Sequence, residues 1–258
     1  MPLPGALGSD LTDLATLLLN DGPRKAISTP RRVRVIFNQT TIVDTTRAVW
    51  VWEHDHYPHF YIPSSELKDC TVRDRQPIRS GNAVRAAIAE LIVPAKAGIP
   101  EKTTTRVLRF ENDGSLGALA GLEDAPIFVH PKDPFKRIDI LPSTRPVKVR
   151  IAGKTVAASS FAMHLHETGL PVRYYLPLAS IDPSILRRSS TVTSCPYKGD
   201  AEYYDVVLDG KVYKDAVWYY NHPAQESLAI AGLVSFYNEK VDILLDGKPL
   251  EKPVTHFA

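Results

Sequence analysis

Cysteine is scarce in this sequence, with Cys70 and Cys195 the only two among 258 residues. Two cysteines exclude a disulfide framework and are typical of a reducing compartment, so we expect a cytoplasmic protein. No run of about 20 apolar residues occurs, so we expect no membrane-spanning helix and no membrane partner. The segment Leu11–Leu19 is too short for a signal peptide, contains Asp13 and lacks a basic start.

Excess charge of one sign and the common cofactor motifs are also missing. The formal net charge is only +2, and no stripe of basic and aromatic residues occurs, so we expect no nucleic-acid partner. The sequence has no glycine-rich phosphate loop, no dinucleotide fingerprint and no paired-cysteine zinc site. It also lacks an Asp-x-Asp pair that would hold two magnesium ions. We therefore expect a protein that works without a cofactor and without a metal.

An internal repeat is the main organising feature. Residues Val33–Leu67 align without a gap with Val147–Ile181, and this alignment places Glu53 on Glu167. Two copies are too few for a solenoid, which needs about three, so the repeat indicates a duplicated domain. We expect an N-terminal extension (1–30), a first repeat (31–127), a linker (128–146) and a second repeat (147–258).

Short alternating segments between turn residues predict a mainly β chain, with a short helix at Asp10–Asn20 and few other helices. The segment Asn82–Leu91 has a helical composition, and Ala224–Val234 predicts another short helix. Three hairpins are predicted, the last of them around Asp209-Gly210, whose residues tolerate positive φ. Their strands are Arg32–Phe37 with Thr41–Asp44, Lys148–Ile151 with Thr155–Ala158, and Tyr204–Leu208 with Lys211–Lys214.

The pentapeptide Cys195-Pro-Tyr-Lys-Gly199 occurs only in the second repeat. It places a thiol, a phenol and an ammonium group beside two residues that favour a turn. The first repeat has Gly81 at the position of Cys195. This asymmetry predicts one functional site, located in the second repeat.

Several segments of the second repeat match the pattern of a known family: Val147–Val156, Glu167–Gly169, Tyr174–Pro177, Cys195–Gly199, Ala216–Tyr219 and Ile230–Tyr237. With these segments, the second repeat resembles the domain of unknown function 427 family. The resemblance implies a tandem member with two β-tent-like domains, each built from small twisted antiparallel sheets, the first copy being degenerate. Some labels of this family mention nucleotidyltransferase activity, which the missing magnesium motif does not support.

Lys198 is the leading candidate within the pentapeptide, because a lysine beside a glycine turn suits a carboxylate or phosphate group. The alternative is an ion pair with a carboxylate such as Glu167 or Asp200. Cys195 is a candidate nucleophile whose thiolate a nearby lysine would favour. Its alternative is the ordinary role of a small buried residue.

Two further residues are candidates for proton transfer. Glu167 could act as a general base, although the retention of Glu53 in the degenerate copy favours a structural role. His222 could act as base only if the fold brings it near the pentapeptide.

Aromatic residues crowd the second repeat, and Tyr175, Tyr197 and Trp218 could line a ligand pocket. The alternative is an ordinary sheet core with tyrosines at its rim. Arg173 could supply a second cation for an anionic ligand, or it could be a surface arginine.

Two histidine pairs have the spacing of neighbours on one face of a strand, His164 with His166 and His54 with His56. Neither pair has acidic or cysteine partners at ligand-like spacing, so we do not assign a metal to them.

Two functions from different classes fit these residues. One is a cofactor-independent enzyme that performs proton transfer on a small organic, anionic metabolite, as isomerases, lyases and cyclases do. The other is a non-catalytic module that binds a small ligand or a protein.

Overall fold

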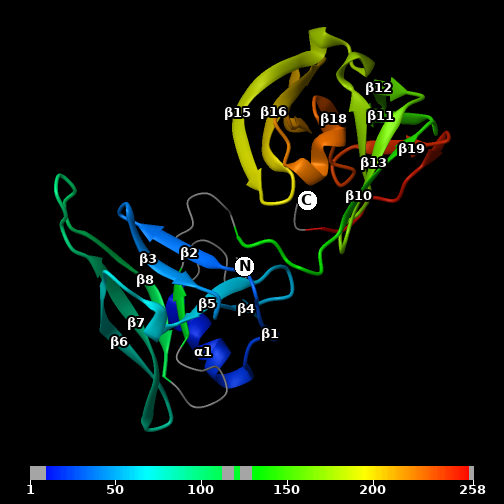
Figure 1. Cartoon of the computed structure of the whole chain (residues 1–258). Coiled ribbons are helices and arrows are strands. Elements are labelled where there is room, and N and C mark those ends of the chain that lie inside the picture. Colours follow the sequence, from blue (N-terminus) through cyan, green and yellow to red (C-terminus); the bar gives the residue numbers. More distant parts are fainter. Residues whose placement is uncertain (1–9, 112–118, 123–129, 256–258) are drawn as a thin grey trace. The chain divides into compact units, whose positions relative to one another are not determined.

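The computed structural model describes residues 10–111, 119–122 and 130–255, with only the backbone described for 119–122. The chain divides into two compact units, 1–133 (unit 1) and 134–258 (unit 2), each with its own antiparallel sheet (Figure 1). The prediction of a mainly β chain with a short N-terminal helix is confirmed. No helix among the described residues is long and apolar enough to cross a membrane.

Unit 1 contains a seven-stranded sheet with the strand order β1-β4-β5-β9-β8-β7-β6, and a separate hairpin of β2 and β3. The α-helix α1 begins after Asp10, whose side chain accepts a hydrogen bond from the backbone N–H of Thr12. The elements are α1 (Leu11–Asp21), β1 (Lys25–Ser28), β2 (Val33–Phe37), β3 (Thr40–Thr45), β4 (Val49–Trp52), β5 (His59–Pro63), η1 (Ser64–Glu66), β6 (Thr71–Ser80), β7 (Ala83–Val93), β8 (Lys102–Phe110) and β9 (Leu119–Leu122).

Unit 2 contains a seven-stranded sheet with the order β10-β13-β14-β18-β17-β16-β15 and a four-stranded sheet with the order β12-β11-β19-β20. The elements are β10 (Ile138–Ser143), β11 (Val147–Ile151), β12 (Lys154–Ser159), β13 (Ala162–Glu167), β14 (Arg173–Pro177), η2 (Leu178–Ser180), η3 (Pro183–Ile185), β15 (Leu186–Cys195), β16 (Gly199–Leu208), β17 (Lys211–Tyr219), η4 (Gln225–Ile230), β18 (Leu233–Phe236), β19 (Asp242–Leu245) and β20 (Lys248–Pro249).

The two units share one strand order, so the sequence repeat corresponds to a structural repeat. Strands β2, β3 and β5 begin and end at the positions that match β11, β12 and β14. Each seven-stranded sheet runs through corresponding strands in the same sequence, from β1 or β10 at one edge to β6 or β15 at the other. The described part of unit 1 has no counterpart of β19 and β20.

The three predicted hairpins are confirmed as β2–β3, β11–β12 and β16–β17. The turn between β16 and β17 places Asp209 and Gly210 at φ values of 49° and 74°. Both values lie in the left-handed region, which Asp tolerates and Gly adopts freely. Local turn chemistry therefore fixes the register next to the turn, and an irregularity between Tyr204 and Val206 shifts it farther along the pair.

The core of unit 2 has two parts, one on each face of the seven-stranded sheet. One part lies between the two sheets and includes Val149, Val217 and Ile243. The other consists mainly of aromatic side chains, among them Tyr175 and Trp218, together with Ile230 of η4. In unit 1, the corresponding second core includes Tyr61, which aligns with Tyr175, but α1 supplies leucines to it. A different element thus fills the same face in each unit.

Two elements differ from the sequence expectation. The segment Asn82–Leu91 does not form a helix, because β7 covers Ala83–Val93 and pairs with both β6 and β8. The small alanines of this strand pack in the core, and this packing outweighs their helix propensity. The helix expected over Ala224–Val234 is limited to the 3-10 helix η4, and β18 begins at Leu233.

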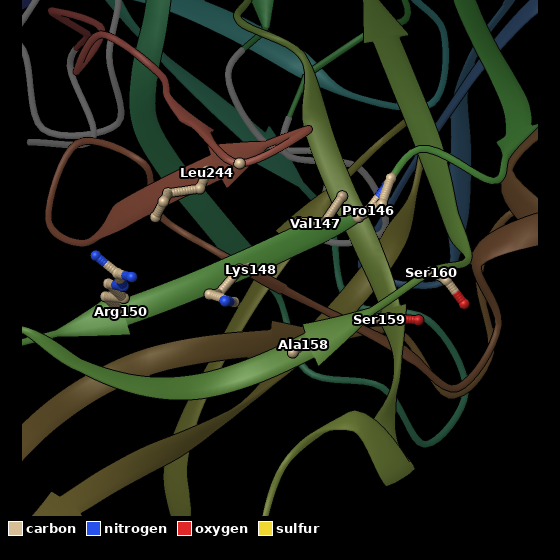
Figure 2. A pocket seen from close by; sticks show the side chains of 9 residues that line it. Pro146, Val147, Lys148, Arg150, Ala158, Ser159, Ser160 and Leu244 are labelled. Atoms are coloured by element: carbon tan, nitrogen blue, oxygen red, sulfur yellow. The ribbon is translucent and has the colours of Figure 1, made fainter.

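The expected linker, 128–146, contains the boundary between the units and also strand β10, which forms an edge of the large sheet of unit 2. The smaller sheet of unit 2 has a groove on its surface, lined by residues of β11, β12 and β19 (Figure 2).

Candidate functional site

The pentapeptide forms the turn between β15 and β16, and Cys195 pairs with Gly199 at the base of this turn. Gly199 has a φ of 95°, and a Cβ atom there would lie 3.1 Å from the carbonyl oxygen of His222. The backbone N–H of Ala224 donates to the carbonyl oxygen of Lys198 at 3.0 Å. The turn is therefore fixed against the loop before η4, and its last position favours glycine through both its positive φ and this close contact.

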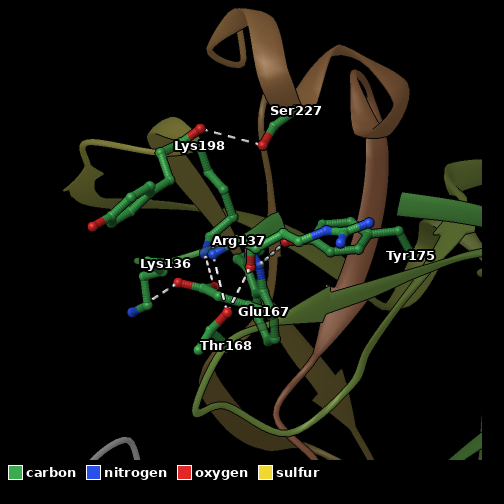
Figure 3. Close-up of polar contacts among 9 residues, drawn as sticks. Lys136, Arg137, Glu167, Thr168, Tyr175, Lys198 and Ser227 are labelled. Carbon is green, nitrogen blue, oxygen red and sulfur yellow. Dashed lines mark hydrogen bonds and ion pairs between the residues drawn. The ribbon is translucent and has the colours of Figure 1, made fainter. Parts of the chain in front are cut away.

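Lys198 extends from this turn to Glu167, the last residue of β13, and its ammonium group donates to Oε2 of the carboxylate. A second lysine, Lys136, lies 3.1 Å from Oε1 of the same carboxylate. Figure 3 shows the two lysine side chains approaching Glu167 from different segments of the chain. We call Lys136, Glu167 and Lys198 the lysine–glutamate cluster.

The cluster joins parts of the sheet that are far apart in strand order. Glu167 lies on β13, next to the edge strand β10, whereas Lys198 follows β15 at the opposite edge. Lys136 precedes β10, and the pairing of Ile138 with Glu167 places it near the carboxylate. Backbone and side-chain hydrogen bonds between Arg137 and Thr168 hold this segment (Figure 3).

The side chain of Glu167 is only 4% exposed, whereas the side chains of Lys136 and Lys198 are 20% and 13% exposed. Burial alone would raise the pKa of Glu167, but the charges and hydrogen bonds of the two lysines outweigh it and lower the pKa. Glu167 therefore stays ionised at neutral pH. The cluster has a net charge of one positive unit, and its lysines reach solvent.

The corresponding position in unit 1 has different partners. Glu53 accepts a hydrogen bond from the hydroxyl of Tyr61 at 2.7 Å and lies 3.8 Å from Nε2 of His59. The turn between β6 and β7 is the short pair Gly81-Asn82, without a lysine. The buried glutamate is thus common to both units, but its pairing with two lysines occurs in unit 2.

The model of one protein family, described as a domain of unknown function (DUF427), matches residues 25–80 and 139–247, which is more than half of the chain. The chain belongs to the DUF427 family. The match covers the first part of the first repeat and most of the second repeat, and it contains Glu53, Glu167 and Lys198 but not Lys136. No curated protein matches the chain.

In the second DUF427 repeat, a wall of aromatic side chains adjoins the cluster. Tyr175 is fully buried, and its hydroxyl accepts a hydrogen bond of 3.0 Å from Nε1 of Trp218. Burial raises the pKa of Tyr175, so the phenol stays protonated. Tyr197 is also buried, and its ring lies 5.4 Å from the ammonium group of Lys136. These predicted wall residues therefore contact one another or the cluster.

Arg173 is buried rather than on the surface, and it forms two hydrogen bonds of 2.7 and 2.6 Å with Glu239. Burial alone would raise the pKa of Glu239. Hydrogen bonds from Arg173 and Thr255 outweigh this effect and lower the pKa to about 2. The guanidinium carbon lies 5.7 Å from the ring of Trp218. Arg173 thus supports the aromatic wall, and its charge is balanced by Glu239.

The remaining two candidates lie at the base of the turn. The backbone of His222 packs on Gly199, but its side chain is exposed and its charge acts on Glu202, whose pKa is lowered mainly by hydrogen bonds from Tyr219 and Asn221. Cys195 is half-buried and forms no disulfide. The structure places both residues at the same corner as Lys198, without a direct contact to Glu167.

The histidine pairs do not form a metal centre in the described parts of the chain, where no group of three or more His, Cys, Asp or Glu side chains is arranged to hold a metal ion. His164 is buried against Tyr174, with ring centroids 4.8 Å apart, whereas His166 is exposed. The rings of His54 and His56 are 5.5 Å apart.

Sequence reasoning missed Lys136 and Glu239. Lys136 belongs to the segment expected to be a linker, and only the pairing of β10 with β13 brings it to Glu167. Glu239 lies 66 residues after Arg173 in a loop, so no local pattern identifies it as the partner.

Proposed function

We propose that unit 2 binds a small organic anion at the lysine–glutamate cluster and catalyses proton transfer on it without a cofactor. The observation that carries this proposal is the shared carboxylate of Glu167, which leaves one positive charge uncompensated at the edge of an aromatic wall. An anionic group that approaches Lys136 and Lys198 would balance this charge. Fixed ammonium groups of this kind stabilise negative charge that develops in a transition state.

Each residue has a distinct role in this proposal. Lys198 binds and stabilises the carboxylate, enolate or phosphate of the substrate, and Lys136 assists it. Glu167 acts as a positioning residue rather than a general base, because its lowered pKa makes it a poor proton acceptor. Tyr175, Tyr197 and Trp218 shape the apolar side of the site, and Arg173 keeps Trp218 in place.

The proton acceptor in this proposal is His222, with Cys195 as a nucleophile in a variant of the mechanism. The backbone of His222 is fixed on the turn that carries Lys198. A histidine side chain can take up and return a proton, which is the role that this proposal requires.

The test uses a panel of small carboxylates and phosphate esters in D2O, with wild type, Lys198→Met and a matched control, Lys154→Met. Lys154 pairs with Asp209 at the exposed surface of the same unit. We expect one class of compound to raise the melting temperature of wild type and the control, but not of Lys198→Met. Proton NMR should show deuterium entering a C–H position of that compound. No stabilisation of wild type by any compound would contradict the proposal.

The second candidate, a binding module without turnover, has one specific observation in its favour. Glu167 is held as a carboxylate by both lysines, so the cluster could recognise an anion without any group that takes up a proton. The same experiment separates the two functions. Stabilisation that depends on Lys198, without deuterium incorporation in any compound, would identify the binding module.

We also propose that the protein acts in the cytoplasm on a small molecule, and not on nucleic acid or a membrane. The free thiols of Cys70 and Cys195 support a reducing compartment. The nearly neutral net charge of +2 supports a partner other than nucleic acid.

A further inference from the structure

A groove on the four-stranded sheet of unit 2 shares no residue with the lysine–glutamate cluster. It has a volume of about 460 Å³, which lies within the range of small-molecule sites. Its lining comes from β11 and the residue before it, from the end of β12 and from β19 with its following turn (Figure 2). It includes Pro146, Lys148, Arg150, Ala158, Ser160 and Leu244.

The two cations of the groove lack a counter-charge. Lys148 and Arg150 lie two positions apart on β11, so they belong to the same face of the sheet. Neither forms an ion pair with any residue in the described ranges, and the Nε atom of Arg150 is buried without a hydrogen-bond partner. The carboxylate opposite Arg150 in the register, Asp242, pairs with Lys252 instead. A guanidinium without an ion-pair partner beside a groove is available to bind the oxygens of an anionic ligand.

Small or apolar side chains form the rest of the lining. Lys148 has Ala158 on one neighbouring strand and Leu244 on the other, directly opposite it in each register. Ala158 is exposed and leaves a hollow between larger neighbours, and Pro146 and Leu244 add apolar surface. The groove therefore offers two cations beside an apolar surface.

The first repeat provides an internal comparison. Pro146 and Ala158 align with Arg32 and Asp44, which form a bidentate ion pair with two contacts of 2.6 Å. In unit 1, charged side chains thus occupy the positions of Pro146 and Ala158, and they neutralise each other. Lys148 aligns with Arg34, and Arg150 aligns with Ile36. These four positions hold two cations in each repeat, but only the first repeat also has a carboxylate there, that of Asp44.

We propose that this groove is a second binding site, specific for a small organic oxyanion that carries an apolar group. The guanidinium of Arg150 binds the phosphate or carboxylate oxygens in a bidentate manner, and Lys148 adds a second charge. The apolar part of the ligand lies over Ala158 against Leu244 and Pro146. The site is independent of the lysine–glutamate cluster, so either could exist without the other.

The experiment titrates the isotope-labelled full chain with phenyl phosphate, benzoate or inorganic phosphate and follows the backbone amide signals by NMR. We expect phenyl phosphate or benzoate to shift the amides of Lys148, Arg150, Ala158 and Ser160, and the stronger of the two identifies the preferred headgroup. Inorganic phosphate should bind at least tenfold more weakly, because it lacks the apolar group.

Two variants test the assignment. Ala158→Phe fills the hollow at an exposed strand position and should weaken binding at least tenfold without lowering the melting temperature. The double variant Lys148→Ala with Arg150→Ala should do the same by removing the charges. Lys248→Ala on β20, the matched control, should bind like wild type.

The proposal is overturned if neither organic probe shifts the groove amides. It is also overturned if Ala158→Phe and the double variant bind as tightly as wild type. A loss of binding in Lys248→Ala equal to that in the double variant would show general charge attraction instead, and this outcome too contradicts a specific site.

Discussion

Replacing Glu167 by glutamine leaves the ammonium groups of Lys136 and Lys198 close together around a neutral amide inside unit 2. Removing one partner of a fully buried ion pair typically costs about 3 to 5 kcal/mol, because the other charge stays buried. The lysine side chains here are 20% and 13% exposed, so each ammonium group can regain part of its hydration. We therefore expect Glu167→Gln to destabilise unit 2 by about 2 to 3 kcal/mol.

The matched control is Glu53→Gln, the same change at the corresponding position of unit 1. Glutamine at this position can still accept the hydrogen bond from the hydroxyl of Tyr61. We expect this variant to destabilise unit 1 by about 1 kcal/mol, because the hydrogen bond from Tyr61 loses its charged acceptor. The two variants therefore compare a glutamate held by two lysines with one that accepts from a tyrosine hydroxyl and lies near His59.

Hydrogen exchange read by mass spectrometry is the suitable assay, because peptides from β13 and from β15–β16 report on unit 2, and peptides from β4–β5 report on unit 1. The pH dependence gives a second readout. Because the folded-state pKa of Glu167 is lowered, its contribution to stability is present above about pH 4.3 and is lost as the pH falls through the folded-state value. This acid-dependent loss should be smaller in Glu167→Gln. Equal destabilisation by Glu167→Gln and Glu53→Gln, with unchanged pH dependence, would show that the two lysines do not set the contribution of Glu167 to stability.

Three further predictions concern other parts of the chain. Burial, with the nearby charges of His56 and His130, lowers the pKa of His54 to about 4, so unit 1 should lose stability as the pH falls from about 6.5 towards 4. In hydrogen exchange, His54→Phe should abolish much of this loss, and an unchanged pH profile would contradict the assignment. Arg173→Met leaves the carboxylate of Glu239 buried without its main partner, so urea denaturation should show unit 2 destabilised by about 3 kcal/mol, and a loss below 1 kcal/mol would count against a structural ion pair. Gly199→Ala should lower the stability of unit 2 by about 2 to 3 kcal/mol, because the position has a positive φ and the new Cβ would press on the backbone of His222. Gly153→Ala has a positive φ but open space around it, so it should cost about 1 kcal/mol. Equal costs would show that the backbone contact at Gly199 is unimportant.

Much of the fold follows from local sequence patterns. The ungapped repeat predicts the duplication, and matching positions indeed form matching strands, such as β5 and β14. Turn residues such as Asp209-Gly210 predict the hairpins, because the backbone conformation they permit is needed there. The segment Asn82–Leu91 is different: its alanines favour a helix locally, but pairing on both sides makes it a strand.

The sequence predicts the candidate residues of the site but not which of them form ion pairs with one another. The sequence identifies Lys198 as a candidate and leaves Glu167 or Asp200 as its acidic partner, and the structure pairs it with Glu167. The choice depends on the curvature that brings the β15 edge of the sheet near β13, which no local pattern encodes. Lys136 and Glu239 complete the charge arrangement from distant segments. The groove beside Lys148 forms only because β19 pairs with β11, and no local pattern predicts this pairing.

The most direct test of the account is NMR of the full chain with ¹³C at the Cε atoms of its lysines, during titration with small carboxylates and phosphate esters. If the lysine–glutamate cluster binds an organic anion, one compound should shift the signals of Lys136 and Lys198 together and saturate. The signal of Lys154, paired at the surface with Asp209, should remain in place. If no compound moves Lys136 and Lys198, or if Lys154 moves equally, the cluster is a structural ion pair and the proposed function is wrong.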